Sequence, residues 1–178
     1  YVQTTGIWKT VWTEYVPDIR LDYVKMTPNL HDMALEIEYQ IDAPESAMAG
    51  GNLMVVATVT FGDMLISKTM TVMTSDHTKT KIDVFHKTNG QTNCGMEWGV
   101  RTWSPESPDL YDITFEVVSD GKILDTVGSY FAMREIRIDG SNILLNGHPL
   151  YQRLILDQGY WKDSHLTPPS EEALIEDI

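Results

Sequence analysis

The sequence is poor in cysteine and in positive charge, and each shortage excludes a class of protein. Cys94 is the only cysteine among 178 residues, so no intrachain disulfide and no zinc site made of several thiolates can form. Lysine and arginine number 13 against 26 aspartates and glutamates, giving a net charge of −13 that would repel a nucleic acid. We therefore expect a fold held together by packing, with no cofactor and no nucleic-acid partner.

Long apolar runs are also missing. The sequence has no stretch of about 18 apolar residues, which a membrane-spanning helix needs, so no membrane partner is expected. Its first residues lack the basic start and the hydrophobic stretch of a signal peptide. The chain opens without methionine and inside a β-like pattern, which suggests a piece of a larger protein. The compartment stays open, with the cytoplasm slightly favoured.

Along much of the sequence, apolar and polar residues alternate with a period of two. Residues 33–41 place Leu35, Ile37 and Tyr39 on one face and Glu36 and Glu38 on the other, which is typical of a half-buried strand. Glycine, proline, asparagine and aspartate separate such runs at hairpin spacing, which predicts an all-β fold, an antiparallel β-sandwich. The other predicted strands are residues 10–16, 19–27, 53–61, 65–73, 79–85, 96–103, 111–117 and 122–131.

A tyrosine near the start of a late strand refines this prediction. Asp109 lies two residues before Tyr111, a spacing found in the tyrosine corner of immunoglobulin-like sandwiches, where the phenol hydroxyl ties down the preceding connection. A tyrosine at a strand start is also common for packing alone. Both interpretations stay open at this point. Of the methionines, Met70 and Met73 are expected to fill gaps in the core.

The pattern changes after residue 134. Asn146-Gly147 is a two-residue turn of the kind that closes a hairpin. Residues 150–156 form a nearly continuous apolar run, which fits a strand covered on both faces, as in a parallel sheet or barrel. Residues 167–178 then turn helical, with Ser170 as N-cap and an apolar stripe of Leu174, Ile175 and Ile178. A strand followed by a helix is the first unit of a β/α series.

Four segments of the chain resemble glycoside hydrolase family 2, which includes β-galactosidases, β-glucuronidases and β-mannosidases. They occur in the family's order and run nearly from end to end of the chain. The segments begin with Thr5-Gly6-Ile7-Trp8, Trp103-Ser104-Pro105-Glu106, Asp125-Thr126-Val127-Gly128 and Leu145-Asn146-Gly147-His148-Pro149.

The resemblance implies a domain organisation. Residues 1–16 correspond to the last strand of a jelly-roll sugar-binding domain, residues 17–134 to a complete immunoglobulin-like sandwich, and residues 135–178 to the start of a (β/α)8 catalytic barrel. Such a barrel takes about 250 residues, so most of it is absent, including the late segments that carry the family's two catalytic glutamates. No catalytic residue is therefore assigned, and the chain alone is expected to be inactive.

The function that follows is structural. The resemblance implies a non-catalytic domain that spaces and orients the neighbouring domains of a retaining β-glycosidase, with a β-galactosidase-like parent favoured weakly. Asp157 and Gln158 would follow the first barrel strand, at the rim where barrel enzymes assemble their sites, and could bind carbohydrate substrate in the parent enzyme. They could equally cap a strand end. The family's better-known branches carry Arg-His-Glu here, so the sugar stays open.

An alternative function is a stand-alone carbohydrate-binding module. Aromatic faces stack on sugars, but β-like surroundings favour packing for most of the five tryptophans, Trp8 and Trp12 being the pair most expected to lie exposed. The chain's tryptophans are Trp8, Trp12, Trp98, Trp103 and Trp161.

Glu36 and Glu38 could form a carboxylate pair, but a solvated strand face is the better interpretation. The histidines show no ligand spacing, so no metal is expected. The terminal strands, if unpaired, could recruit a second copy and form a homodimer.

Overall fold

The computed structural model describes residues 3–85, 96–97 and 99–177. Their contacts separate two units. The larger is Val16–Tyr151, and the smaller joins Tyr1–Tyr15 to Gln152–Ile178.

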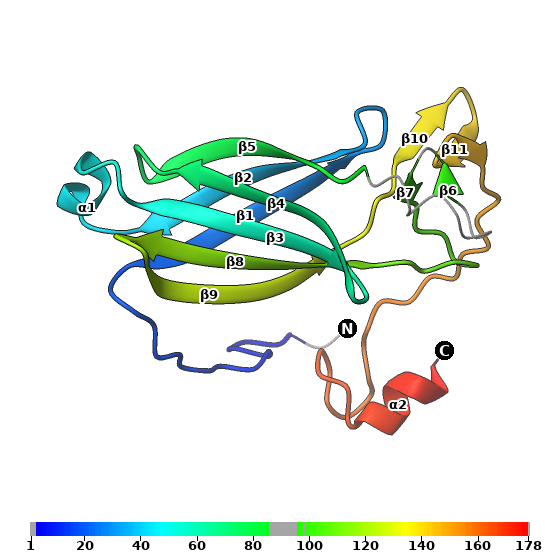
Figure 1. Cartoon of the computed structure of the whole chain (residues 1–178). Helices are drawn as coiled ribbons and strands as arrows, with labels where there is room; N and C mark the ends of the chain where they lie inside the picture. Colours follow the sequence, from blue (N-terminus) through cyan, green and yellow to red (C-terminus); the bar gives the residue numbers. More distant parts are fainter. Residues whose placement is uncertain (1–2, 86–95, 98, 178) are drawn as a thin grey trace. The chain divides into compact units, whose positions relative to one another are not determined.

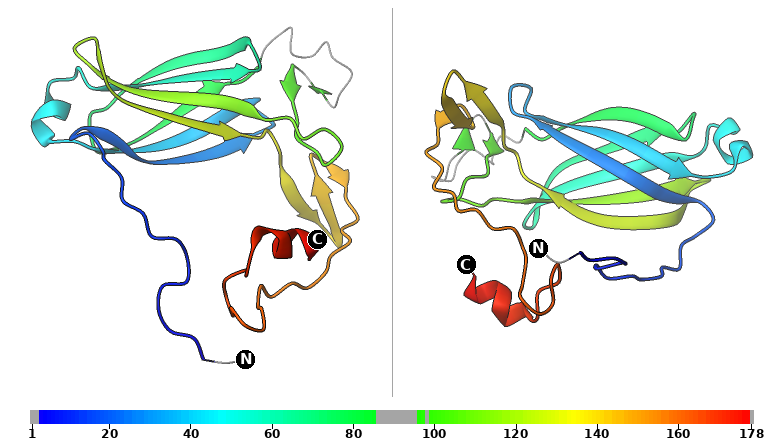
Figure 2. Two further views of the ribbon diagram at one scale, coloured as in Figure 1. Left: turned by 90° about the horizontal axis from the view of Figure 1, so that it is seen from below. Right: turned by 180° about the vertical axis from the view of Figure 1, so that it is seen from behind.

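The larger unit contains two antiparallel sheets that lie face to face (Figures 1 and 2). The smaller sheet has the order β1-β2-β5 and the larger the order β4-β3-β8-β9, so the chain changes sheets after β2, after β4 and after β5. This is the arrangement of an immunoglobulin-like sandwich, and the predicted fold class is confirmed. The strands are β1 (Arg20–Asn29), β2 (Ala34–Asp42), β3 (Met54–Phe61), β4 (Met64–Val72), β5 (His77–Asp83), β8 (Tyr111–Ser119) and β9 (Lys122–Phe131).

The core forms where the alternating faces of the sheets meet. In β2, Leu35, Ile37 and Tyr39 are buried, whereas Glu36 is exposed, as the period of two predicts. The Tyr39 ring meets Phe115 of β8 edge-on, with 5.8 Å between the ring centroids. The two sheets therefore share one hydrophobic core.

Tyr111 forms the tyrosine corner. Its hydroxyl oxygen accepts a hydrogen bond from the backbone N–H of Arg101 at 2.7 Å, while its ring stacks on Phe131 at 5.2 Å. The Arg101 guanidinium pairs with Asp109 at 3.4 Å and lies over the Phe61 ring at 4.4 Å. The hydroxyl thus ties the connection before β8 to the core, and this interpretation of the Asp109–Tyr111 pattern is confirmed.

A small antiparallel sheet of three strands follows the sandwich, and we call it the hairpin. It consists of β10 (Ile136–Asp139), β11 (Asn142–Leu145) and β12 (His148–Pro149). Asn146 and Gly147 close the β11–β12 turn with φ of 51° and 81°, the left-handed pair that a type I′ turn requires. The predicted turn is confirmed.

Several predicted elements are wrong. The described residues in 10–16 and 150–156 form no strand, because a strand needs a neighbour's backbone groups and the described chain supplies none beside them. The region 96–103 holds two short strands, β6 (Met96–Glu97) and β7 (Val100–Arg101). Met73 is buried as predicted, but Met70 is 70% exposed.

One helix was not predicted. The five-residue α1 (Glu45–Ala49) begins directly after Pro44, and a segment this short carries no helical periodicity that a sequence pattern could reveal.

The smaller unit brings the two ends of the chain together. Its helix α2 (Glu171–Glu176) begins at the predicted N-cap, where the Ser170 hydroxyl accepts from the Ala173 N–H at 3.2 Å. The Thr167 hydroxyl donates to the Trp8 carbonyl at 3.2 Å. Ile178, the last residue of the predicted stripe, lies outside the described residues. Among the helices described, none has the length and apolar content to span a membrane.

We predict that Tyr111→Phe lowers the free energy of unfolding by about 1–3 kcal/mol, because the Arg101 N–H loses its acceptor while the ring packing remains. Urea denaturation measures this. Tyr130→Phe is the control, since Tyr130 is 65% exposed on β9, and it should change stability by less than about 0.5 kcal/mol. Equal effects of the two substitutions would contradict a tyrosine corner.

Candidate functional site

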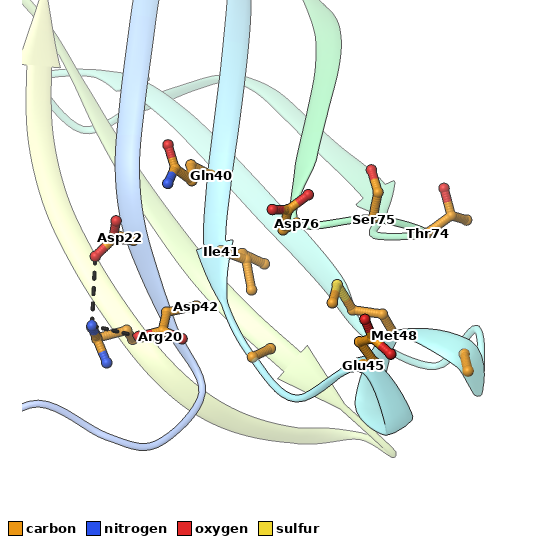
Figure 3. Close-up of a pocket in the computed structure, with 12 residues that line it drawn as sticks. Arg20, Asp22, Gln40, Ile41, Asp42, Glu45, Met48, Thr74, Ser75 and Asp76 are labelled. Carbon is orange, nitrogen blue, oxygen red and sulfur yellow. Dashed lines mark ion pairs between the residues drawn. The ribbon is translucent and has the colours of Figure 1, made fainter.

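A cleft lies at one end of the smaller sheet, beside α1 (Figure 3). Its volume is about 840 Å³. The Arg20 guanidinium pairs with Asp42 at 2.6 Å and with Asp22 at 3.6 Å. The polar residues that line it are Arg20, Asp22, Gln40, Asp42, Glu45, Thr74, Ser75 and Asp76.

This cleft lacks the chemistry of a hydrolase site. A glycosidase needs a carboxyl group that stays protonated in an apolar pocket, whereas Asp22 and Asp42 are well exposed and paired with arginine. No three histidine, cysteine, aspartate or glutamate side chains within the described ranges are grouped so as to hold a metal ion. The arginine–aspartate contacts of this cleft are therefore ordinary surface ion pairs.

Glu36 and Glu38 lie on the outer face of the smaller sheet. Glu38 sits between the ammonium groups of Lys25 at 3.1 Å and Lys79 at 3.3 Å, and hydrogen bonds from these lysines hold its pKa below the usual 4.5. Glu36 accepts from the Asn29 amide at 3.0 Å. A lowered pKa is the reverse of what a general acid needs, so the pair acts as a solvated, charged strand face.

A group of hydrogen-bonded residues joins the hairpin to the sandwich. The Asn146 side chain donates to the Trp103 carbonyl at 2.9 Å and accepts from the Glu135 N–H at 3.0 Å. The Trp103 N–H donates to the Met133 carbonyl at 2.9 Å, and the Arg134 guanidinium lies 5.0 Å from the centre of the Trp103 ring. We call these five residues the hairpin junction.

Sequence reasoning missed the hairpin junction. It assigned Asn146 a role in the turn, which is correct for the backbone, but the side chain bonds to Trp103, which is 43 positions away. Such a contact has no local signal. The only available clue was the choice of asparagine, whose amide can bond in two directions while its backbone tolerates the left-handed conformation.

Asp157 and Gln158 belong to the smaller unit, and both are exposed. The Asp157 carboxylate accepts from the Gly159 N–H at 2.7 Å, which forms a local turn. Neither side chain lines the cleft of Figure 3. A substrate-binding role for these two residues stays a prediction.

Trp8 and Trp12, also in the smaller unit, are 52% and 69% exposed. They line a groove of about 450 Å³ with Lys9, Leu166 and Pro168 among its walls, which we call the tryptophan groove. Lys9 lies over the Trp8 ring at 4.8 Å, and the Trp12 indole N–H donates to Glu14 at 2.7 Å.

The other tryptophans behave differently. Trp103 and Trp161 are half-buried, as the packing interpretation predicts, and Trp98 lies outside the described residues. Trp8 and Trp12 lie exposed, as the sequence predicts for these two residues.

The fold places the protein among the immunoglobulin-like β-sandwich domains. Sequence comparison identifies its family. Residues 19–134 match the family described as glycosyl hydrolases family 2, and the chain belongs to that family. The resemblance seen in the sequence is confirmed. The predicted domain limits at residues 16 and 134 stay predictions.

Individual relatives are much longer than this chain. It is 39% identical over 56 residues to the β-galactosidase BgaC of Bifidobacterium adolescentis, a match that covers 31% of this chain and 5% of BgaC. The chain therefore spans a small fraction of that relative's length.

Solved structures share the fold. A β-glucuronidase from Ruminococcus gnavus, in complex with a C6-substituted uronic isofagomine, has a TM-score of 0.59 at 15% identity, covering 90% of this chain and 23% of its own. Bacteroides uniformis β-glucuronidase 3 has a TM-score of 0.55 at 15% identity, covering 77% of this chain and 15% of its own. At this identity the likeness shows the fold alone.

We predict that Asn146→Gly loosens the hairpin, because glycine keeps the left-handed backbone but removes both side-chain hydrogen bonds. Amide hydrogen exchange in β10 and β11 should become roughly 5- to 100-fold faster, since each lost bond is worth about 0.5–1.5 kcal/mol. Amides of β8 should not change. Asn142→Ala, at an exposed position on the same hairpin, is the control. Equal exchange rates in both variants would disprove the anchoring role of the Asn146 side chain.

We predict that an NMR titration of Glu38 gives a pKa below 4.5. Because the folded pKa is lowered, the stabilisation by Glu38 is present above its unfolded pKa and is lost as the pH falls through the folded value. Lys25→Met and Lys79→Met should each raise the Glu38 pKa, while Lys68→Met on β4 should leave it unchanged. A Glu38 pKa insensitive to both lysines would refute this assignment.

Proposed function

We propose that the sandwich is a non-catalytic domain of a family 2 glycosidase that spaces and orients the segments before and after it. The hairpin junction is the observation that carries this proposal. A spacer must hold the outgoing chain in one direction, and Asn146 ties the hairpin both to the connection before β8, through Trp103, and to Glu135 in the segment between β9 and β10.

The chemistry of the described residues supports a structural role. A retaining glycosidase needs two carboxyl groups about 5–5.5 Å apart, one of them with a raised pKa. Hydrogen bonds and ion pairs instead lower the pKa of Asp32, Glu38 and Glu172. In the 840 Å³ cleft, Asp22 and Asp42 are both paired with Arg20.

The parent reaction, on this proposal, is hydrolysis of a terminal β-glycoside with retention, through a covalent glycosyl-enzyme intermediate. A β-galactoside is the first choice of substrate, supported by the match to BgaC. Asp157 and Gln158 would bind carbohydrate in that parent enzyme.

The tryptophan groove favours a second candidate, a carbohydrate-binding module. Two exposed indole faces beside an ammonium group combine an apolar platform with a hydrogen-bond donor, the chemistry by which proteins hold a pyranose ring. This candidate needs sugar binding by the chain itself, which the spacer does not.

Two measurements on the purified chain separate these functions. The spacer predicts no turnover of nitrophenyl β-galactoside or β-glucuronide and no heat on calorimetric titration with galactosides. Turnover would overturn the non-catalytic role. Millimolar or tighter binding that Trp12→Ala abolishes and Tyr15→Ala leaves unchanged would establish the module in place of the spacer.

A further inference from the structure

The turn between β11 and β12 contains a pair of residues that can react with each other. In an Asn-Gly sequence the backbone nitrogen of the glycine can attack the Cγ carbon of the asparagine, because glycine has no side chain to hinder the approach. Asn146-Gly147 is such a pair. Gly147 is exposed, and a Cβ atom added to it would meet none of the surrounding atoms within 4 Å. Water therefore has access to this turn.

The reaction has two steps, and water is its only co-reactant. The Gly147 nitrogen forms a bond to Cγ of Asn146, while the bond from Cγ to Nδ2 breaks. Nδ2 leaves as ammonia and takes the proton of the Gly147 N–H with it, so a five-membered succinimide ring remains. Water then adds to one of the two ring carbonyls and opens the ring, which leaves aspartate or isoaspartate at position 146.

The backbone of the turn opposes ring closure. A five-membered ring requires the Asn146 Cβ and the Gly147 nitrogen to lie on the same side of the Cα–C bond that joins them. Asn146 has a φ of 51°, in the left-handed conformation of its turn, and in that conformation the two atoms lie on nearly opposite sides. The turn must therefore open before the ring can form.

The hairpin junction opposes ring closure as well, because it holds the Asn146 amide at both ends. Nδ2 donates to the Trp103 carbonyl at 2.9 Å, and Oδ1 accepts from the Glu135 N–H at 3.0 Å. The backbone N–H of Asn146 donates to the Glu135 carbonyl at 2.9 Å. Movement of Cγ toward the Gly147 nitrogen must break both side-chain bonds, since their partners belong to other segments of the chain.

We propose that Asn146 is a site of spontaneous deamidation which the folded hairpin protects, and that the modification releases the hairpin from the sandwich. A carboxylate has no hydrogen to donate, so the product would place two acceptors against each other where Asn146 now donates to Trp103. Isoaspartate also inserts the side-chain carbon into the main chain, which a two-residue turn does not accommodate. This modification goes beyond the proposed spacer function and is measured independently of it.

Peptide mapping of the chain after incubation in mildly alkaline buffer tests the protection. Trypsin cuts after Arg137 and Arg153, so the peptide 138–153 reports on Asn146 separately from Asn89-Gly90, which lies outside the described residues. We expect Asn146 to deamidate at least about fivefold more slowly in the folded chain than in the isolated peptide, the smaller end of what two hydrogen bonds supply. An equal rate in chain and peptide, or a product without isoaspartate, would overturn the proposal.

Asn146→Asp tests the release, because it supplies the aspartate product without the reaction. Amide hydrogen exchange in β10 and β11 should become at least about fivefold faster, while the amides of β8 should not change. Asn142→Asp is the matched control, since it makes the same charge change at an exposed position of the same hairpin, and it should exchange like the unmodified chain. Exchange in Asn146→Asp that equals the control would refute the release.

A second measurement covers the case in which Asn146→Asp fails to fold. Modified and unmodified molecules of one aged sample differ in charge, so ion exchange separates them without any substitution. The fraction modified at Asn146 should show the faster exchange in β10 and β11. Equal exchange in the two fractions would overturn the proposal.

Discussion

The structure depends on burying alternate side chains of two sheets against each other. Each strand commits every second residue to the core, and Tyr39 of β2 and Phe115 of β8 meet there from opposite sheets. Because the chain has a single cysteine, no disulfide can join the two sheets. Packing and hydrogen bonds must therefore hold the sheets together. Tyr111 combines both, because its ring is buried against Phe131 while its hydroxyl holds the backbone of Arg101.

Asn146, like Tyr111, serves two structural roles with one side chain, at the point where the chain leaves the sandwich. Asn146 adopts the left-handed turn conformation and uses both ends of its amide to hold Trp103 and Glu135. A hairpin of three short strands would be marginal alone. Anchored through Trp103 to the connection before β8, it becomes an extension of the sandwich with a defined direction. Tyr111 and Asn146 therefore perform the same task at consecutive points of one sheet end.

Patterns that act over a few residues could be predicted from the sequence. Alternation placed the strands of both sheets, Asn146-Gly147 predicted its turn, and Ser170 predicted the start of α2. The predicted strands at 10–16 and 150–156 failed because a strand depends on a neighbour, which a local pattern does not supply.

The candidate sites depend even more on distant residues. The Asn146 amide bonds to the Trp103 carbonyl, 43 positions away in the chain, so no local sequence pattern could reveal this contact. Asp157 and Gln158 were placed by family resemblance alone, and their local geometry is that of a turn.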